Sequence, residues 1–114
     1  MTNIIREKLP EIDSKKLFQL LRKNNVSRAY LFGSITTSKF NKEKSDIDII
    51  IELVEMPPLE KGETLIGLWE QLEAFFERKV DLVTDQPIKN PYFRRSLEET
   101  KVLIYDRKSE GIFF

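Results

Sequence analysis

The chain has 114 residues, and 19 Lys or Arg residues balance 19 Asp or Glu residues. This length suits one domain with a single core, which we expect to span residues 1–114. An apolar content of 40% and a charged content of 33% are typical of soluble globular proteins and exclude a disordered chain. The balanced charge argues against a domain that coats nucleic acid through bulk charge, so direct nucleic-acid binding is not expected.

The chain contains no cysteine and no histidine. Disulfides, thiolate metal sites and cysteine catalysis are therefore excluded, and the usual general base and zinc ligand are missing. Carboxylates, hydroxyls and basic side chains must carry any chemistry. No stretch approaches membrane-spanning length and the N-terminus lacks a long apolar run, so we expect a cytoplasmic protein.

The first half of the chain predicts a helix, a strand and a short helix. Asp13 or Ser14 can cap a helix whose leucines recur at helical spacing and which ends near residues 24–25. Residues 26–32 read as a strand that ends at a glycine. A short helix is predicted over residues 34–40, and a polar loop over residues 41–44.

The second half alternates strands with helices. A long helix over residues 60–78 carries one apolar stripe, formed by Leu65, Leu68, Trp69, Leu72, Phe75 and Phe76. The other predicted elements are strand 46–54 (ended by Pro57 and Pro58), strand 79–84, connector 87–91, helix 92–100 and strand 101–105. This order predicts an α/β fold, with one small sheet of about four strands and helices packed against it.

Two carboxylates, Asp46 and Asp48, stand at i and i+2 in a predicted strand. Strand side chains alternate between faces, so both point the same way with Cα atoms roughly 6–7 Å apart. The other face carries Ile47, Ile49 and Ile51. Because two neighbouring acids repel each other and resist burial, and a divalent cation removes both penalties, we interpret them as Mg²⁺ ligands. The alternative is a solvated outer face of an edge strand.

A small-residue turn, Gly33-Ser34, follows the first predicted strand. A strand that runs through Gly-Ser into a helix presents free N–H groups and a hydroxyl, and the helix N-terminus adds partial positive charge. Phosphate oxygens fit such a turn, and glycine lets the backbone approach them closely. A simple turn with Ser34 as N-cap is the competing interpretation.

A third acid, Asp81, stands in the short apolar strand 79–84. If this strand lies beside the first acidic one, Asp81 completes a three-carboxylate cluster. Such a cluster can hold two divalent ions, one activating an attacking oxygen and one gripping a triphosphate. Asp81 could also accept a hydroxyl proton as general base. An outward-facing strand residue is the alternative.

These segments, Gly33-Ser34, Ser45-Asp46-x-Asp48 and Val80-Asp81-Leu82-Val83, resemble the minimal nucleotidyltransferases of the DNA polymerase beta-like superfamily. The resemblance covers nearly the whole chain. It implies a nucleotidyltransferase fold with a mixed sheet, and Mg²⁺-dependent transfer of a nucleoside monophosphate, usually from ATP, to a hydroxyl. Asp46 and Asp48 would bind both metal ions, Asp81 would bind the one nearer the acceptor, and Gly33 and Ser34 would hold the triphosphate.

Many proteins of this kind are antitoxins encoded beside an all-helical HEPN-type ribonuclease toxin. Family members neutralise the toxin by binding it and, in some cases, by adenylylating one of its tyrosines. The resemblance therefore implies a HEPN toxin as partner. Both a homo-oligomer and a hetero-oligomer remain open for the chain. Transfer to a small molecule such as an aminoglycoside is a further alternative, although we expect no second domain at this length to enclose such an acceptor.

One position departs from the family pattern. The family commonly reads Gly-Ser-x-Ala-Arg-Gly, whereas Thr37 stands at the arginine position here. A bidentate guanidinium contact to phosphate is therefore missing. The basic residues that could compensate as point charges are Arg28, Lys39, Lys42 and Lys44, unless the lysines simply form a solvated loop. This departure motivates a second hypothesis, a decayed antitoxin that acts only by binding its toxin.

Two further segments have open interpretations. Arg94 and Arg95 could meet phosphate or an acidic partner, or belong to a solvated helix face. The C-terminal Gly111-Ile-Phe-Phe114 is apolar where tails are normally polar. It either docks on its own domain or contributes to a contact with another subunit.

Overall fold

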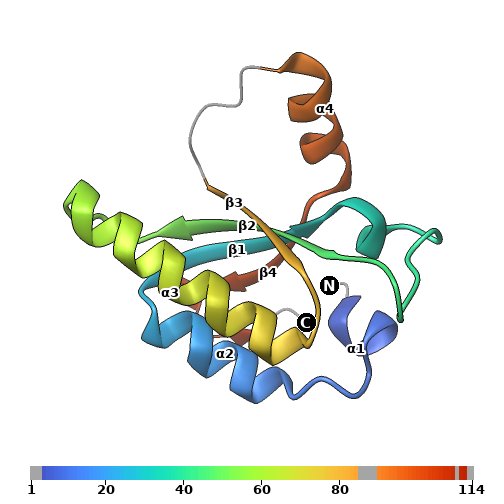
Figure 1. The fold of residues 1–114 in the computed structure, drawn as a ribbon, viewed down its shortest axis with the longest axis horizontal. Coiled ribbons are helices and arrows are strands. Elements are labelled where there is room, and N and C mark those ends of the chain that lie inside the picture. Colours follow the sequence, from blue (N-terminus) through green and yellow to red (C-terminus); the bar gives the residue numbers. More distant parts are fainter. Residues whose placement is uncertain (1–3, 85–89, 110, 113–114) are drawn as a thin grey trace.

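A computed structural model describes residues 4–84, 90–109 and 111–112 (Figure 1). Its centre is a mixed sheet with the strand order β3-β2-β1-β4-β5. The strands are β1 (Val26–Phe32), β2 (Ile47–Leu53), β3 (Val80–Thr84), β4 (Val102–Asp106) and β5 (Gly111–Ile112). Strand β1 pairs antiparallel with β2 and β4, while β3 runs parallel to β2 and forms one edge. The predicted α/β class with a small mixed sheet is confirmed.

Helices cover the two faces of the sheet unequally (Figure 1). The α-helices are α1 (Ile4–Lys8), α2 (Ser14–Lys23), α3 (Pro58–Phe76) and α4 (Pro91–Thr100), and two short 3₁₀ helices are η1 (Gly33–Thr36) and η2 (Arg107–Ser109). Helices α2 and α3 lie side by side under one face. Helix α4 stands on the opposite side, near one end of the sheet.

The main core lies between the sheet and helices α1 to α3. It contains Leu17 and Leu21 of α2, Leu68 and Leu72 of α3, and the isoleucine face of β2, all with almost no exposed surface. A smaller cluster of Phe32, Ile50 and Leu97 packs on the other face, beneath α4. Because α4 covers only part of that face, polar side chains of β2 and β3 can reach solvent there.

Local signals set the ends of α2 as the sequence predicted. The side chain of Asp13 accepts hydrogen bonds from the backbone N–H groups of Lys15 and Lys16 at 3.1 and 3.2 Å. These bonds satisfy donors that the first turn leaves without partners. At the other end Asn25 adopts a φ of 59°, a left-handed conformation that asparagine tolerates. The predicted bounds of β1 are confirmed in full.

Two predicted helices have different bounds. Helix α3 begins at Pro58, because proline at the first helical position loses no intrahelical hydrogen bond, and it ends before Glu77, whose φ of 53° is left-handed. The helix predicted over residues 34–40 is wrong in extent: only η1 forms. The hydroxyls of Thr36 and Thr37 donate to the carbonyls of Gly33 and Ser34, at 2.7 and 2.9 Å, and so close the turn after four residues.

Three elements escaped prediction: helix α1, the short 3₁₀ helix η2 and strand β5. Helix α1 is a single turn whose Ile4 and Ile5 are buried, too short to show a clear period. Strand β5 pairs with the end of β4, so residues 111–112 of the apolar tail dock on their own sheet. Residues 113–114 and most of the predicted connector 87–91 lie outside the described residues. None of the described helices has the length and apolarity that crossing a membrane requires.

We predict that Asp13→Ala lowers the free energy of unfolding by about 1 kcal/mol, since two N–H groups of α2 lose their acceptor. Chemical denaturation measures this change. Asp13→Asn is the matched control, because asparagine keeps an oxygen acceptor at the cap and removes only the charge. Equal destabilisation by both variants would show that charge, and not capping, matters at this position.

Candidate active site

The site centres on two carboxylates from neighbouring strands. Strands β2 and β3 run parallel, and their register pairs Asp48 with Asp81. Val80 and Leu82, on either side of Asp81, belong to the core under α3, so the strand alternation turns Asp81 to the opposite, partly open face. There the two carboxyl groups approach within hydrogen-bonding contact. The sequence analysis required the strand of Asp81 to lie beside the strand of Asp48, and the structure confirms this pairing.

Partial burial and the neighbouring carboxylates raise the pKa of Asp48 to about 6. The causes are partial burial, the hydrogen bond with Asp81, the charge of Asp81 and the charge of Asp46, in that order. Asp46 immediately precedes β2 and is also half-buried, and its effect on Asp48 is electrostatic. In the described part of the chain, no three carboxylates already form a ready-made metal site.

The backbone of Gly33 lies directly against the carboxyl group of Asp48. Gly33 has a φ of +73° and directly follows Phe32, the last residue of β1, which pairs with Asp48. A Cβ atom at position 33 would clash with Asp48 Oδ2. The positive φ favours glycine here, and a Cβ atom at this position would also force the Asp48 carboxylate to move.

The turn after Gly33 is tighter than the sequence suggested. Ser34 is the second residue of η1, and the Thr37 N–H closes the turn by donating to the Ser34 carbonyl at 2.9 Å. Thr37, at the family's arginine position, uses its hydroxyl on the same carbonyl. Because η1 has only four residues, its axial dipole is smaller than that of the helix that the sequence predicted.

Helix α4 contributes a residue that sequence reasoning missed. Thr100, the last residue of α4, accepts a hydrogen bond from the Gly33 N–H at 3.3 Å and donates one to the Ser96 carbonyl at 2.8 Å. The N–H group that we interpreted as a phosphate donor therefore has a protein partner at present. Only the tertiary fold brings these residues together, because they stand 67 positions apart.

Sequence reasoning also missed Arg78, which holds the loop that leads into β2. Its Nη1 donates to the Ser45 carbonyl at 3.2 Å, and its guanidinium lies 5.7 Å from the centroid of the Phe40 ring. The loop itself is closed by Asn41, whose side chain accepts from the N–H groups of Glu43 and Lys44. The loop that precedes Asp46 is thus held at both ends.

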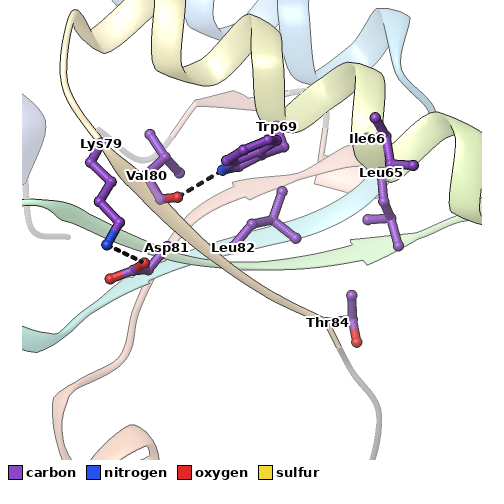
Figure 2. Close-up of a pocket in the computed structure, with 8 residues that line it drawn as sticks. All are labelled: Leu65, Ile66, Trp69, Lys79, Val80, Asp81, Leu82 and Thr84. Atoms are coloured by element: carbon purple, nitrogen blue, oxygen red, sulfur yellow. Dashed lines mark hydrogen bonds and ion pairs between the residues drawn. The ribbon is translucent and has the colours of Figure 1, made fainter.

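A pocket of about 370 Å³ opens beside Asp81, between α3 and the edge strand β3 (Figure 2). Lys79 lies at its rim, with its Nζ 4.0 Å from Asp81 Oδ1, and both side chains are more than half exposed. Trp69 forms the opposite wall and donates from Nε1 to the Val80 carbonyl at 2.8 Å (Figure 2). Asp81 therefore belongs both to the carboxylate pair and to this pocket.

The donor set suits a hard divalent cation. Carboxylate oxygens are the ligands that Mg²⁺ prefers, and an ion would offset both the burial of the Asp48 charge and its repulsion by Asp81 and Asp46. Asp46, Asp48 and Asp81 are the residues that could hold it. The backbone of Gly33 borders the Asp48 carboxylate, so a phosphate group that accompanies the ion could reach the Gly33 turn as well.

Solved structures with known partners share this fold. A toxin–antitoxin structure with AMP-PNP superposes with a TM-score of 0.61 at 22% identity, and covers 87% of this chain and 77% of that one. A structure of the tri-AMPylated HEPN toxin of Shewanella oneidensis in complex with an MNT antitoxin gives a TM-score of 0.54 at 21% identity, over 85% of this chain and 72% of that one. At these identities the likeness shows the fold alone.

Sequence comparison goes further. A protein of Methanocaldococcus jannaschii, named as a candidate protein adenylyltransferase, is 38% identical over 96 residues, which cover 84% of this chain and 94% of that protein. The profile of the family described as "Polymerase beta, Nucleotidyltransferase" matches residues 15–110, which include every acid of the site. The resemblance seen in the sequence is thereby confirmed: the chain belongs to the polymerase beta nucleotidyltransferase family.

Proposed function

We propose that this nucleotidyltransferase is a protein adenylyltransferase that acts as an antitoxin. With Mg²⁺ it transfers AMP from ATP to a hydroxyl, in particular a tyrosine of a cognate HEPN-type toxin in the cytoplasm, and residues 1–114 act as one nucleotidyltransferase domain. The observation that carries the proposal is the contact between Asp48 and Asp81 against the backbone of Gly33. The AMPylated toxin complex and the adenylyltransferase relative support the choice of reaction and acceptor.

In this proposal the three acids have separate roles. Asp46 and Asp48 hold two Mg²⁺ ions, and Asp81 holds the one nearer the acceptor. When bound, the ions offset the charge of the triphosphate and of the attacking oxygen. The N–H groups of Gly33 and Ser34, with the Ser34 hydroxyl, position the phosphates, for which Gly33 must exchange its bond with Thr100.

The transfer itself is a single displacement at the α-phosphorus of ATP. The acceptor hydroxyl oxygen forms a bond to this phosphorus while the bond to the oxygen that bridges the α- and β-phosphates breaks. Pyrophosphate leaves with that bridging oxygen. The hydroxyl proton passes to Asp81, the carboxylate on the exposed side of the pair and the one that lines the pocket.

A second candidate function is a binding module that neutralises its toxin by occlusion alone. Thr37 favours it, because its hydroxyl is committed to the Ser34 carbonyl and it supplies no cation to a phosphate. Titration with ATP distinguishes the two candidate functions, because a pure binding module needs no Mg²⁺-dependent affinity for ATP.

We predict that the chain labels its toxin partner from ATP carrying a labelled α-phosphate, in the presence of Mg²⁺, and that Asp48→Asn reduces labelling at least about 100-fold. The partner is the all-helical protein encoded by the neighbouring gene. Glu55→Gln, which removes an exposed carboxylate from the turn after β2, is the matched control and should label normally. Undiminished labelling by Asp48→Asn, or none by the wild type, would refute the catalytic proposal.

We predict that Gly33→Ala weakens binding of Mg²⁺ and ATP about tenfold or more, because a methyl group there displaces the Asp48 carboxylate and forces alanine into a left-handed conformation. Titration calorimetry measures the affinity. Gly62→Ala is the control: it lies in α3 with open space around it, and alanine should stabilise the helix by about 0.5–1 kcal/mol. Wild-type affinity in Gly33→Ala would place the nucleotide elsewhere.

The raised pKa of Asp48 predicts a pH-dependent loss of stability in the metal-free protein. Since the pKa is higher in the folded state than the usual value of 3.8, stability is complete below about pH 4 and falls as pH rises through about 6. Between these limits the wild type should lose about 1 kcal/mol relative to Asp48→Asn, a value reduced for solvent screening. Denaturation at both pH values measures the difference.

Millimolar Mg²⁺ should restore the lost stability of the wild type at pH 7 and leave Asp48→Asn unchanged. If both proteins show the same pH dependence without metal, the carboxylate pair is not the source of the strain.

A further inference from the structure

The pocket beside Asp81 is apolar along most of its length. Leu65, Ile66 and Trp69 of α3 form one wall, and Leu82 of β3 forms the floor (Figure 2). Ile66 is 61% exposed and Trp69 is 41% exposed, both high values for large apolar side chains. This arrangement joins an exposed apolar surface directly to a carboxylate of the candidate active site.

The backbone of β3 presents free hydrogen-bonding groups along the same groove. The Lys79 carbonyl accepts from the Ile47 N–H, so the alternation of the strand directs the backbone groups of Val80, Leu82 and Thr84 away from β2. In the part of the chain that the structure describes, β3 is an edge strand and no other strand pairs with this side.

The start of this edge is already closed by α3. Glu73 accepts from the Val80 N–H at 2.9 Å, and Trp69 donates to the Val80 carbonyl at 2.8 Å. Both polar groups of Val80 are therefore satisfied by side chains. The first edge position that can pair with another chain is Leu82, next to Asp81.

The two faces of β3 determine where the side chains of a strand added to its edge would point. Val80 and Leu82 face α3, whereas Asp81 and Val83 face the open side, where Asp48 lies. In an added strand, consecutive side chains alternate in the same way. A side chain beside Asp81 would thus have a neighbour beside Leu82 that points into the apolar pocket.

We propose that the acceptor protein binds as an extended segment along the edge of β3 at Leu82 and Thr84, with an apolar residue next to the acceptor residue seated in the pocket of Leu65, Ile66 and Trp69. This inference rests on the proposed function for the identity of the acceptor. Continuity carries it, because the pocket and the carboxylate pair share Asp81 and the edge groups flank that residue. Backbone pairing supplies affinity, and the pocket supplies selection for apolar neighbours of the acceptor hydroxyl.

Trp69 is the only tryptophan of the chain, so its fluorescence reports on the pocket without any need for catalysis. The probe is an end-blocked peptide of about nine residues whose central tyrosine is flanked on both sides by leucine. We expect a saturable blue shift of the emission at peptide concentrations up to about 1 mM, without ATP or metal. Two control peptides, one with aspartate in place of both leucines and one with N-methylated amides beside the tyrosine, should bind at least about tenfold more weakly.

Variants of α3 test the same groove from the protein side. Ile66→Asp should weaken binding of the leucine-flanked peptide at least about tenfold and raise the KM for AMP transfer to it, with kcat and ATP affinity unchanged. Leu59→Asp is the matched control, because Leu59 is a 77% exposed apolar residue of the same helix that does not line the pocket. It should bind the peptide as the wild type does.

The outcomes separate this inference from the proposed function. Peptide binding that depends on Ile66, without any AMP transfer, would keep the groove and refute the enzyme. AMP transfer to the toxin with no fluorescence change, or with equal affinity for all three peptides, would overturn the groove. The Trp69 emission could instead shift with protein concentration alone, together with dimers in sedimentation. That result would also overturn the groove and assign the edge to a second copy of the chain.

Discussion

The parallel register of β2 and β3 is the constraint on which the site depends. It sets Asp81 opposite Asp48, and a slip of one residue would turn Asp81 into the core beneath α3. Burial of Val80 and Leu82 opposes such a slip, as do the bonds that Trp69 and Glu73 make to Val80. The contacts that hold β3 in the fold are therefore the ones that aim its carboxylate.

The acids of the site work against the stability of the fold. Partial burial and the charges of Asp81 and Asp46 oppose the ionisation of Asp48. The buried isoleucines on the opposite face of β2 nevertheless anchor the strand in the core. The anchoring lets the repulsion persist without pushing the strands apart. The fold already holds Asp48 and Asp81 in contact, so these two ligands do not have to be gathered when a cation binds.

Local sequence patterns predicted most of the fold and part of the candidate site. The alternation of acids and isoleucines fixed the faces of β2, and the cap at Asp13 and the bounds of β1 followed from neighbouring residues. The contact of Asp81 with Asp48 could be stated only as a condition, because strand pairing is non-local. The roles of Thr100 and Arg78 could not be predicted from the sequence, since their hydrogen-bonding partners are distant in the chain. The helix predicted over residues 34–40 was too long, because the hydroxyls of Thr36 and Thr37 close the turn early.

The two side chains that close Val80 also have a consequence for how molecules of this protein behave in concentrated solution. A bare edge strand can recruit the edge of another molecule, and repeated pairing leads to aggregates. Here Trp69 and Glu73 occupy the first outward position, and the charges of Lys79 and Asp81 flank it. In the described part of β3 only Leu82 and Thr84 are left with outward backbone groups, so a second copy finds fewer pairing positions here than at a bare edge.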